Sequence, residues 1–82
     1  MTPEQTRAAR GWLDLSQEEL AKAAGVSLST VRDFEKGRRV PIAATLGAMR
    51  TALEARGIGF VMLADGKPCG VTFAQTKSGE PH

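Results

Sequence analysis

Two short helices joined by almost no connecting chain most strongly constrain how this sequence can fold. They lie in "SQEELAKAAGVSLSTVRDFEKG", which begins at Ser16. Ser16 with Glu19 three residues later forms a capping-box pattern, and Gly25 is the residue type that ends a helix in the left-handed conformation. Ser27 is the cap of a second helix, which Gly37 ends. Because only two residues lie between Gly25 and the second helix, the two helices must cross steeply.

Helical signals continue on both sides of this pair, from Thr2 to about Arg56. Thr2 is suited to the N-cap of a first helix with Pro3 in its first turn, and that helix is expected to end at Trp12 or Leu13. Asp14 follows, and Asp tolerates the left-handed geometry that a break requires. Pro41 begins a last helix, which Gly57 ends. Its apolar stripe has spacings of 4, 3 and 4 and predicts a buried face of Ile42, Leu46, Met49 and Leu53.

The sequence changes character after residue 57. Residues 58–63, "IGFVML", and 69–74, "CGVTFA", are rich in β-branched and aromatic residues, and Asp65-Gly66 lies between them as a turn signal. We therefore expect a C-terminal β-hairpin. Residues 76–82 have no apolar residue beyond Pro81 and are expected to be disordered. The predicted organisation is a helical domain over 1–57, a hairpin segment over 58–75 and a tail over 76–82.

The second helix of the pair presents two chemically different faces. Helical spacing directs Val31 and Phe34 to the core. The opposite face has two small or apolar groups, then a fork-shaped donor and an acceptor, which suit the base edges of DNA. The predicted base-reading residues are Leu28, Ser29, Arg32 and Asp33. The alternative is that Arg32 and Asp33 are an ordinary solvated pair on an exposed helix.

The stretch "SQEELAKAAGVSLSTVRDFEKGRRVP" resembles the helix-turn-helix of the Cro and phage-repressor class, the Xre-like family. The resemblance covers about Glu4 to Arg56 and rests on residues that match in register: Gln17, Glu19-Leu20-Ala21, Gly25-Val26-Ser27, Val31 and Phe34-Glu35-Lys36-Gly37. It implies a mainly α fold, a bundle of four to five helices that binds duplex DNA, usually as a dimer. It also implies that Ser27–Lys36 is the helix that reads DNA. Relatives often have Gly at Asp14, a departure that alters a turn away from the DNA.

The resemblance also assigns roles to single residues. Gln17, at the start of the first helix of the pair, occupies a phosphate-binding position in the family, where free N–H groups favour an anion. The full set of expected phosphate contacts is Ser16, Gln17, Ser27, Thr30, Lys36, Arg38 and Arg39. Arg10 and Glu35 correspond to a structural pair that joins the first helix to the end of the reading helix.

The hairpin segment suggests contact with a second copy of the chain. Both faces of residues 58–63 are apolar, and one small bundle can cover only one of them, so pairing of two copies would cover the second face and the strand edges. The expected dimer interface comprises Ile58, Phe60, Val61, Met62, Leu63, Val71 and Phe73. The alternative is a hairpin folded over the last helix of its own chain. Trp12 is expected to pack on the last helix or on the hairpin, and Cys69 to be an inert strand residue.

Composition narrows the function classes. The formal charge of +2 is too small to indicate nucleic-acid binding without the placement of its charges. The single cysteine and the single histidine, His82, leave few groups for acid–base chemistry or metal binding, so neither an enzyme nor a cofactor is expected. No apolar run approaches the roughly 20 residues of a membrane span, and the N-terminus does not resemble a signal peptide, which favours a cytoplasmic protein.

These observations predict a sequence-specific DNA-binding transcription regulator that binds double-stranded DNA as a homodimer on a palindromic operator. The alternative is an antitoxin or another interaction module whose apolar C-terminal segment binds a partner protein. No membrane partner is expected.

Overall fold

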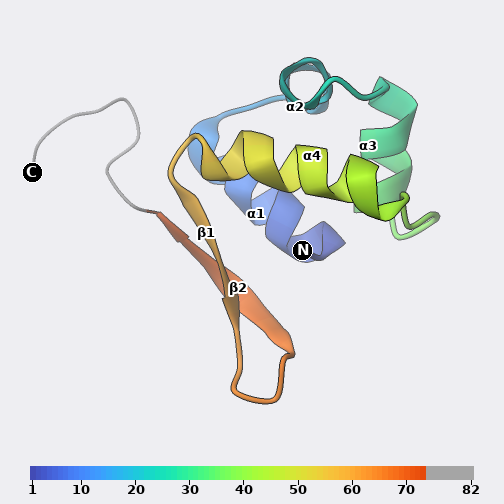
Figure 1. Ribbon diagram of the computed structural model, residues 1–82. Coiled ribbons are helices and arrows are strands. Elements are labelled where there is room, and N and C mark those ends of the chain that lie inside the picture. The colour runs from blue at the N-terminus through green and yellow to red at the C-terminus, as the bar shows by residue number, and fades with distance from the viewer. Residues whose placement is uncertain (74–82) are drawn as a thin grey trace, which may run out of the picture.

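The computed structural model describes residues 1–73, which form four helices followed by one antiparallel hairpin (Figure 1). The helices are α1 (Pro3–Leu13), α2 (Gln17–Ala24), α3 (Leu28–Glu35) and α4 (Ala43–Glu54), and the strands are β1 (Ile58–Met62) and β2 (Pro68–Phe73). The predicted mainly α fold with a C-terminal hairpin is confirmed. The predicted tail over 76–82, with residues 74 and 75 of the hairpin segment, lies outside the described residues.

The predicted ends of α1 and α2 are confirmed because short-range hydrogen bonds set them, whereas α4 begins at Ala43 and not at the predicted Pro41. The Thr2 hydroxyl accepts from the backbone N–H of Gln5, and the Ser16 hydroxyl accepts from that of Glu19. Both caps are complete capping boxes. Asp14 ends α1 with φ of 56°, and Gly25 ends α2 with φ of 70°, so both have the left-handed geometry that the sequence predicts.

A single hydrophobic core holds the four helices together. Its fully buried members include Leu20 of α2, Val31 of α3, and Met49 and Leu53 of α4. Ile58, the first residue of β1, also belongs to this core. The core therefore extends past residue 57 into the hairpin, and the helices and the hairpin share it.

The predicted apolar stripe of α4 is wrong at its first position. Ile42 is 74% exposed, because it is the N-cap residue of α4 and precedes the first helical turn. Met49 and Leu53 are buried and Leu46 packs against the core. The stripe therefore begins one turn later than its spacing predicts.

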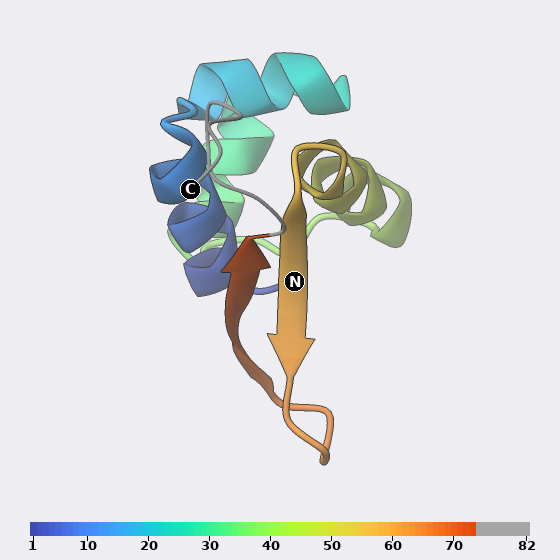
Figure 2. The same ribbon diagram turned by 90° about the vertical axis from the view of Figure 1, so that its left-hand side faces the viewer.

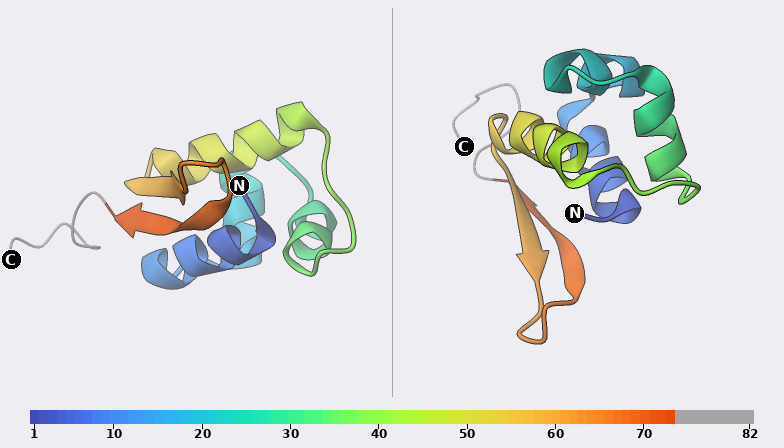
Figure 3. Two further views of the ribbon diagram at one scale, coloured as in Figure 1. Left: turned by 90° about the horizontal axis from the view of Figure 1, so that it is seen from below. Right: turned by 45° about the vertical axis from the view of Figure 1, so that its right-hand side comes forward.

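The hairpin packs its base between α1 and α4, and its tip extends beyond the helices (Figures 2 and 3). In the register, Ile58 pairs with Phe73 and Phe60 with Val71. Cross-strand partners share a face, so these four side chains lie on the face that packs against the core. Trp12 of α1 stacks on Phe73 with ring centroids 4.2 Å apart, which confirms that it packs on the hairpin.

The opposite face of the hairpin is built from small residues. Gly59 pairs with Thr72, and Val61 pairs with Gly70. A Cβ on Gly59 would lie 2.5 Å from Oγ1 of Thr72, so a side chain at this position would require the Thr72 hydroxyl to move. The register shifts between Val61 and Met62, where a bulge bends the hairpin.

Candidate nucleic-acid interface

Helix α3 is held by its buried face and leaves the other face open. Val31 and Phe34 are buried, as their spacing predicts. The Ser27 hydroxyl accepts from the backbone N–H of Thr30 at 3.2 Å and caps the helix. The helix lies at the end of the molecule away from the hairpin tip (Figures 1 and 3).

The C-terminal end of α3 is anchored by a buried carboxylate. Glu35 is 3% exposed, and its two oxygens accept from Nε and Nη2 of Arg10 at 2.6 and 2.7 Å. The third guanidinium nitrogen of Arg10, Nη1, donates to the backbone oxygen of Leu15 at 2.9 Å. Hydrogen bonding to Glu35 raises the pKa of Arg10 above its ordinary value, against the opposing effect of burial. The expected pair is present and ties α1 to α3.

Two further side chains meet at Glu35. Nε2 of Gln17 donates to its Oε1 at 3.0 Å, and Arg7 donates to its backbone oxygen. Arg7 was not singled out in the sequence, although it lies three residues before Arg10 and so shares a helix face with it. The side chain of Gln17 therefore points inward, and one of its amide hydrogens bonds to Glu35. The contact of Gln17 with phosphate remains a prediction.

The predicted base-reading residues are all accessible. Ser29 and Arg32 are exposed, and Leu28 and Asp33 are half-buried. Within residues 1–73 the ion pairs are Arg10–Glu35 and Arg50–Glu54, so Arg32 is not paired with Asp33. The guanidinium of Arg32 is therefore exposed and outside any ion pair of residues 1–73, and its contact with a base remains a prediction.

The cationic side chains that were predicted to contact phosphate also lie outside these two ion pairs. Lys36, Arg38 and Arg39 are exposed and follow α3 directly. In the part of the chain that the structure describes, none of them forms an ion pair. With Arg32 they give one end of the molecule four positive charges outside these pairs, although the whole chain has a formal charge of only +2.

The hydroxyl groups that were predicted to contact phosphate also form hydrogen bonds within the protein. Ser16 caps α2, and Ser27 caps α3 and shares a hydrogen bond of 2.7 Å with the hydroxyl of Thr30. Capping orients these hydroxyls at helix N-termini, which favour anions. Their contact with phosphate is not tested by the fold and remains a prediction.

Two exposed apolar residues, Val40 and Ile42, follow the cationic residues after α3. Thr30 of α3 and Thr45 of α4 line a hollow of about 240 Å³, and the segment from Arg39 to Ile42 forms its other wall. Val40 is 78% exposed and Ile42 is 74% exposed. The apolar spacing of α4 did not predict this exposed surface, because it placed Ile42 in the core.

Only some of the predicted dimer residues remain accessible on the hairpin. Ile58 is 4% exposed and lies in the core of its own chain, so its assignment to an interface is corrected. Packing against that core also engages Phe60, Val71 and Phe73. Met62 and Leu63 stay exposed, and Val61 is half-buried on the opposite face.

The described residues contain no group of three potential metal-ligating side chains. Across residues 1–73 no helix has the length and apolar character needed to cross a membrane. Cys69 is exposed on β2 and forms no disulfide in this part of the chain.

Comparison with known proteins assigns the fold to a family. A search of curated proteins gave no match. The sequence model of a helix-turn-helix family matches residues 7–57, which is more than half of the chain and includes α2, α3 and their short connection. The chain therefore belongs to the helix-turn-helix family of the Xre and Cro type.

Proposed function

We propose that this protein is a sequence-specific DNA-binding transcription regulator that acts as a homodimer on an inverted-repeat operator. The observation that carries the proposal is the open face of α3. There the exposed Arg32 lies outside any ion pair of residues 1–73, next to Leu28 and Ser29.

This face has the chemistry that reading a major groove requires. Arginine donates two parallel hydrogen bonds to the O6 and N7 atoms of guanine, and an apolar side chain contacts the methyl group of thymine. The exposed cations after α3, Lys36, Arg38 and Arg39, supply the phosphate contacts that fix the helix in register. Anchoring by Glu35 supports the proposal, since a reading helix must hold its side chains in one orientation.

The hairpin supports the homodimer. One α3 covers only a few base pairs, so useful specificity needs two copies in successive major grooves, about 34 Å apart. Met62 and Leu63 are exposed at the tip, and in residues 1–73 the sheet consists of two strands with open edges. Contact between two such tips would bury apolar surface and cover edges.

The test is a binding titration on DNA from upstream of the protein's own gene, followed by footprinting. We expect protection of an inverted repeat with half-site centres roughly one helical turn apart. Arg32→Ala should lower the affinity by about 1–3 kcal/mol per half-site, chiefly at one base pair. Equal binding to unrelated duplexes would contradict sequence-specific recognition.

A protein partner is the second candidate, and the exposed Met62 and Leu63 favour it equally well. An antitoxin that uses this apolar tip for its partner would be monomeric on its own, or would aggregate. Sedimentation of the purified full chain distinguishes the two candidates.

A further inference from the structure

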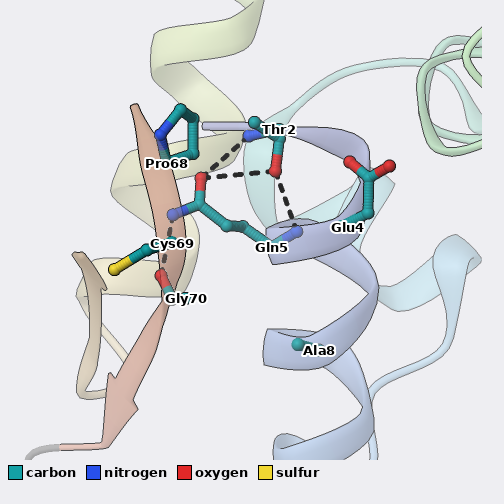
Figure 4. A pocket seen from close by; sticks show the side chains of 7 residues that line it. All are labelled: Thr2, Glu4, Gln5, Ala8, Pro68, Cys69 and Gly70. Atoms are coloured by element: carbon teal, nitrogen blue, oxygen red, sulfur yellow. Dashed lines mark hydrogen bonds between the residues drawn. The ribbon is translucent and has the colours of Figure 1, made fainter. Parts of the chain in front are cut away.

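We propose that Gln5 of α1 sets the direction of the hairpin and thereby the half-site spacing that the dimer accepts. This inference rests on the homodimer of the proposed function. Gln5 is 4% exposed, and its Nε2 donates to the backbone oxygen of Gly70 at 2.7 Å (Figure 4). The same Nε2 donates to the backbone oxygen of Val61 at 3.3 Å. One amide group therefore holds both strands.

The oxygen and the nitrogen of the Gln5 amide form hydrogen bonds with different parts of the protein. Its Oε1 accepts from the backbone N–H of Thr2 at 3.0 Å and completes the capping box of α1. A glutamate could fill that role as well as glutamine can. Only an amide also supplies donors for the two strand oxygens, so the hairpin contact accounts for glutamine at this position.

Gln5 binds the hairpin next to the position where the pairing of its two strands becomes irregular. Val61 pairs with Gly70, and the register shifts at the next position, where Met62 faces Pro68. Proline has no N–H to donate, and a bulge interrupts the ladder. The tip with its exposed Met62 and Leu63 begins beyond this point, so a small rotation there displaces the proposed dimer surface by an amount that grows with the length of the tip.

Helix α1 connects this contact to the reading helix. Arg10 and Arg7 of α1 hold the end of α3 through Glu35, while Gln5 of the same helix holds the hairpin. A hollow of about 420 Å³ separates α1 from the start of β2, lined by Thr2, Glu4, Ala8, Pro68 and Cys69 besides Gln5 and Gly70 (Figure 4). Because side chains do not fill this space, the Gln5 hydrogen bonds join α1 to the first half of β2, whereas Trp12 stacks on Phe73 at the other end of that strand.

The experiment measures spacing preference with the full chain. The probes are duplexes that carry two inverted copies of the footprinted half-site at separations increasing by one base pair, and a duplex with a single half-site. The variants are Gln5→Glu, which keeps the cap and replaces the donors by a carboxylate, and Gln5→Met, which lacks the donors without burying a charge. The matched control is Thr2→Ala, which removes the other hydrogen bond of the capping box, from the backbone N–H of Gln5 to the Thr2 hydroxyl, and leaves the Gln5 donors in place.

We expect the parent and Thr2→Ala to prefer one spacing sharply. Both Gln5 variants should bind the single half-site as the parent does, bind the preferred spacing about tenfold more weakly, and discriminate less between spacings. If Gln5→Glu does not fold, Gln5→Met against Thr2→Ala gives the same comparison. A spacing preference in Gln5→Met as sharp as that of Thr2→Ala would overturn the role of Gln5 and leave the proposed dimer intact. Absence of any spacing preference in the parent would overturn the dimer and this inference together.

Discussion

Both oxygens of the Glu35 carboxylate receive a hydrogen bond from the guanidinium of Arg10, at 2.6 and 2.7 Å. The side chain of Glu35 is 2% exposed and that of Arg10 is 20% exposed. The pair joins α1 to the end of α3, and its geometry is of the bidentate type that gives specificity as well as strength. This contact fixes the position of the end of α3 relative to α1.

The first prediction concerns stability. Glu35→Ala should lower the free energy of unfolding by about 3 kcal/mol, because it leaves the partly buried guanidinium of Arg10 without its carboxylate partner and also removes an acceptor from Gln17. Urea titration of the purified protein measures the change. The matched control is Glu54→Ala, since Glu54 pairs with Arg50 on the surface with side chains 44% and 43% exposed. That control should cost less than about 1 kcal/mol. Equal effects in the two variants would show that the Glu35 pair does not stabilise the fold.

The second prediction concerns pH. Hydrogen bonds from Ser16, chiefly from its backbone N–H, lower the pKa of Glu19 below its ordinary value of 4.5. A lowered carboxyl pKa stabilises the folded state above pH 4.5, and this effect disappears as the pH falls through the folded value. The melting temperature of Glu19→Gln should therefore lie below that of the parent at neutral pH, and the gap should close on acidification. A gap that stays constant with pH would show that the charge of Glu19 has no part in the cap.

The third prediction concerns the salt dependence of DNA binding. Replacing Arg38 and Arg39 by Ala should weaken binding to all sequences and reduce the slope of log K against log salt by about 2, because each arginine should neutralise one phosphate. Titrations at several salt concentrations measure the slope. The control replaces Arg56 and Lys67 by Ala, which removes the same charge at the hairpin end of the molecule. An unchanged slope in the Arg38 and Arg39 variant would exclude these residues from phosphate binding.

The fourth prediction concerns the homodimer. Replacing Met62 and Leu63 by Ser should raise the dimer dissociation constant at least about tenfold, because the proposed interface then has two fewer apolar side chains from each copy. Replacing Val40 and Ile42 by Ser removes two apolar side chains that are even more exposed, away from the hairpin, and should leave the dimer intact. Sedimentation measures both. Point substitutions are preferable to deletion of the hairpin, which would remove Ile58 from the core. An unaltered dimer would place the interface on another surface.

Much of the fold follows from residues that lie close together in the sequence. Thr2 and Ser16 bond to groups three residues ahead, and Asp14 and Gly25 adopt the left-handed conformation that their residue types allow. Such short-range contacts need no tertiary context, so the ends of α1 and α2 were predictable. The inward positions of Val31 and Phe34 follow from helical spacing in the same way. The Arg10–Glu35 pair was expected from the family resemblance, since no rule of spacing connects residues 25 apart.

The contacts that link separate elements were decided by tertiary packing alone. The sequence marks Gln5 as a capping residue, yet its second task requires that β1 and β2 lie beside α1. Gln17 turns inward because Glu35 lies within reach of its amide. Ile42 has the right spacing for the core and is exposed, because α4 begins only after it. Periodicity therefore determined which face of each element is apolar, whereas the available partners, and hence the directions of the long polar side chains, depended on how the elements pack in three dimensions.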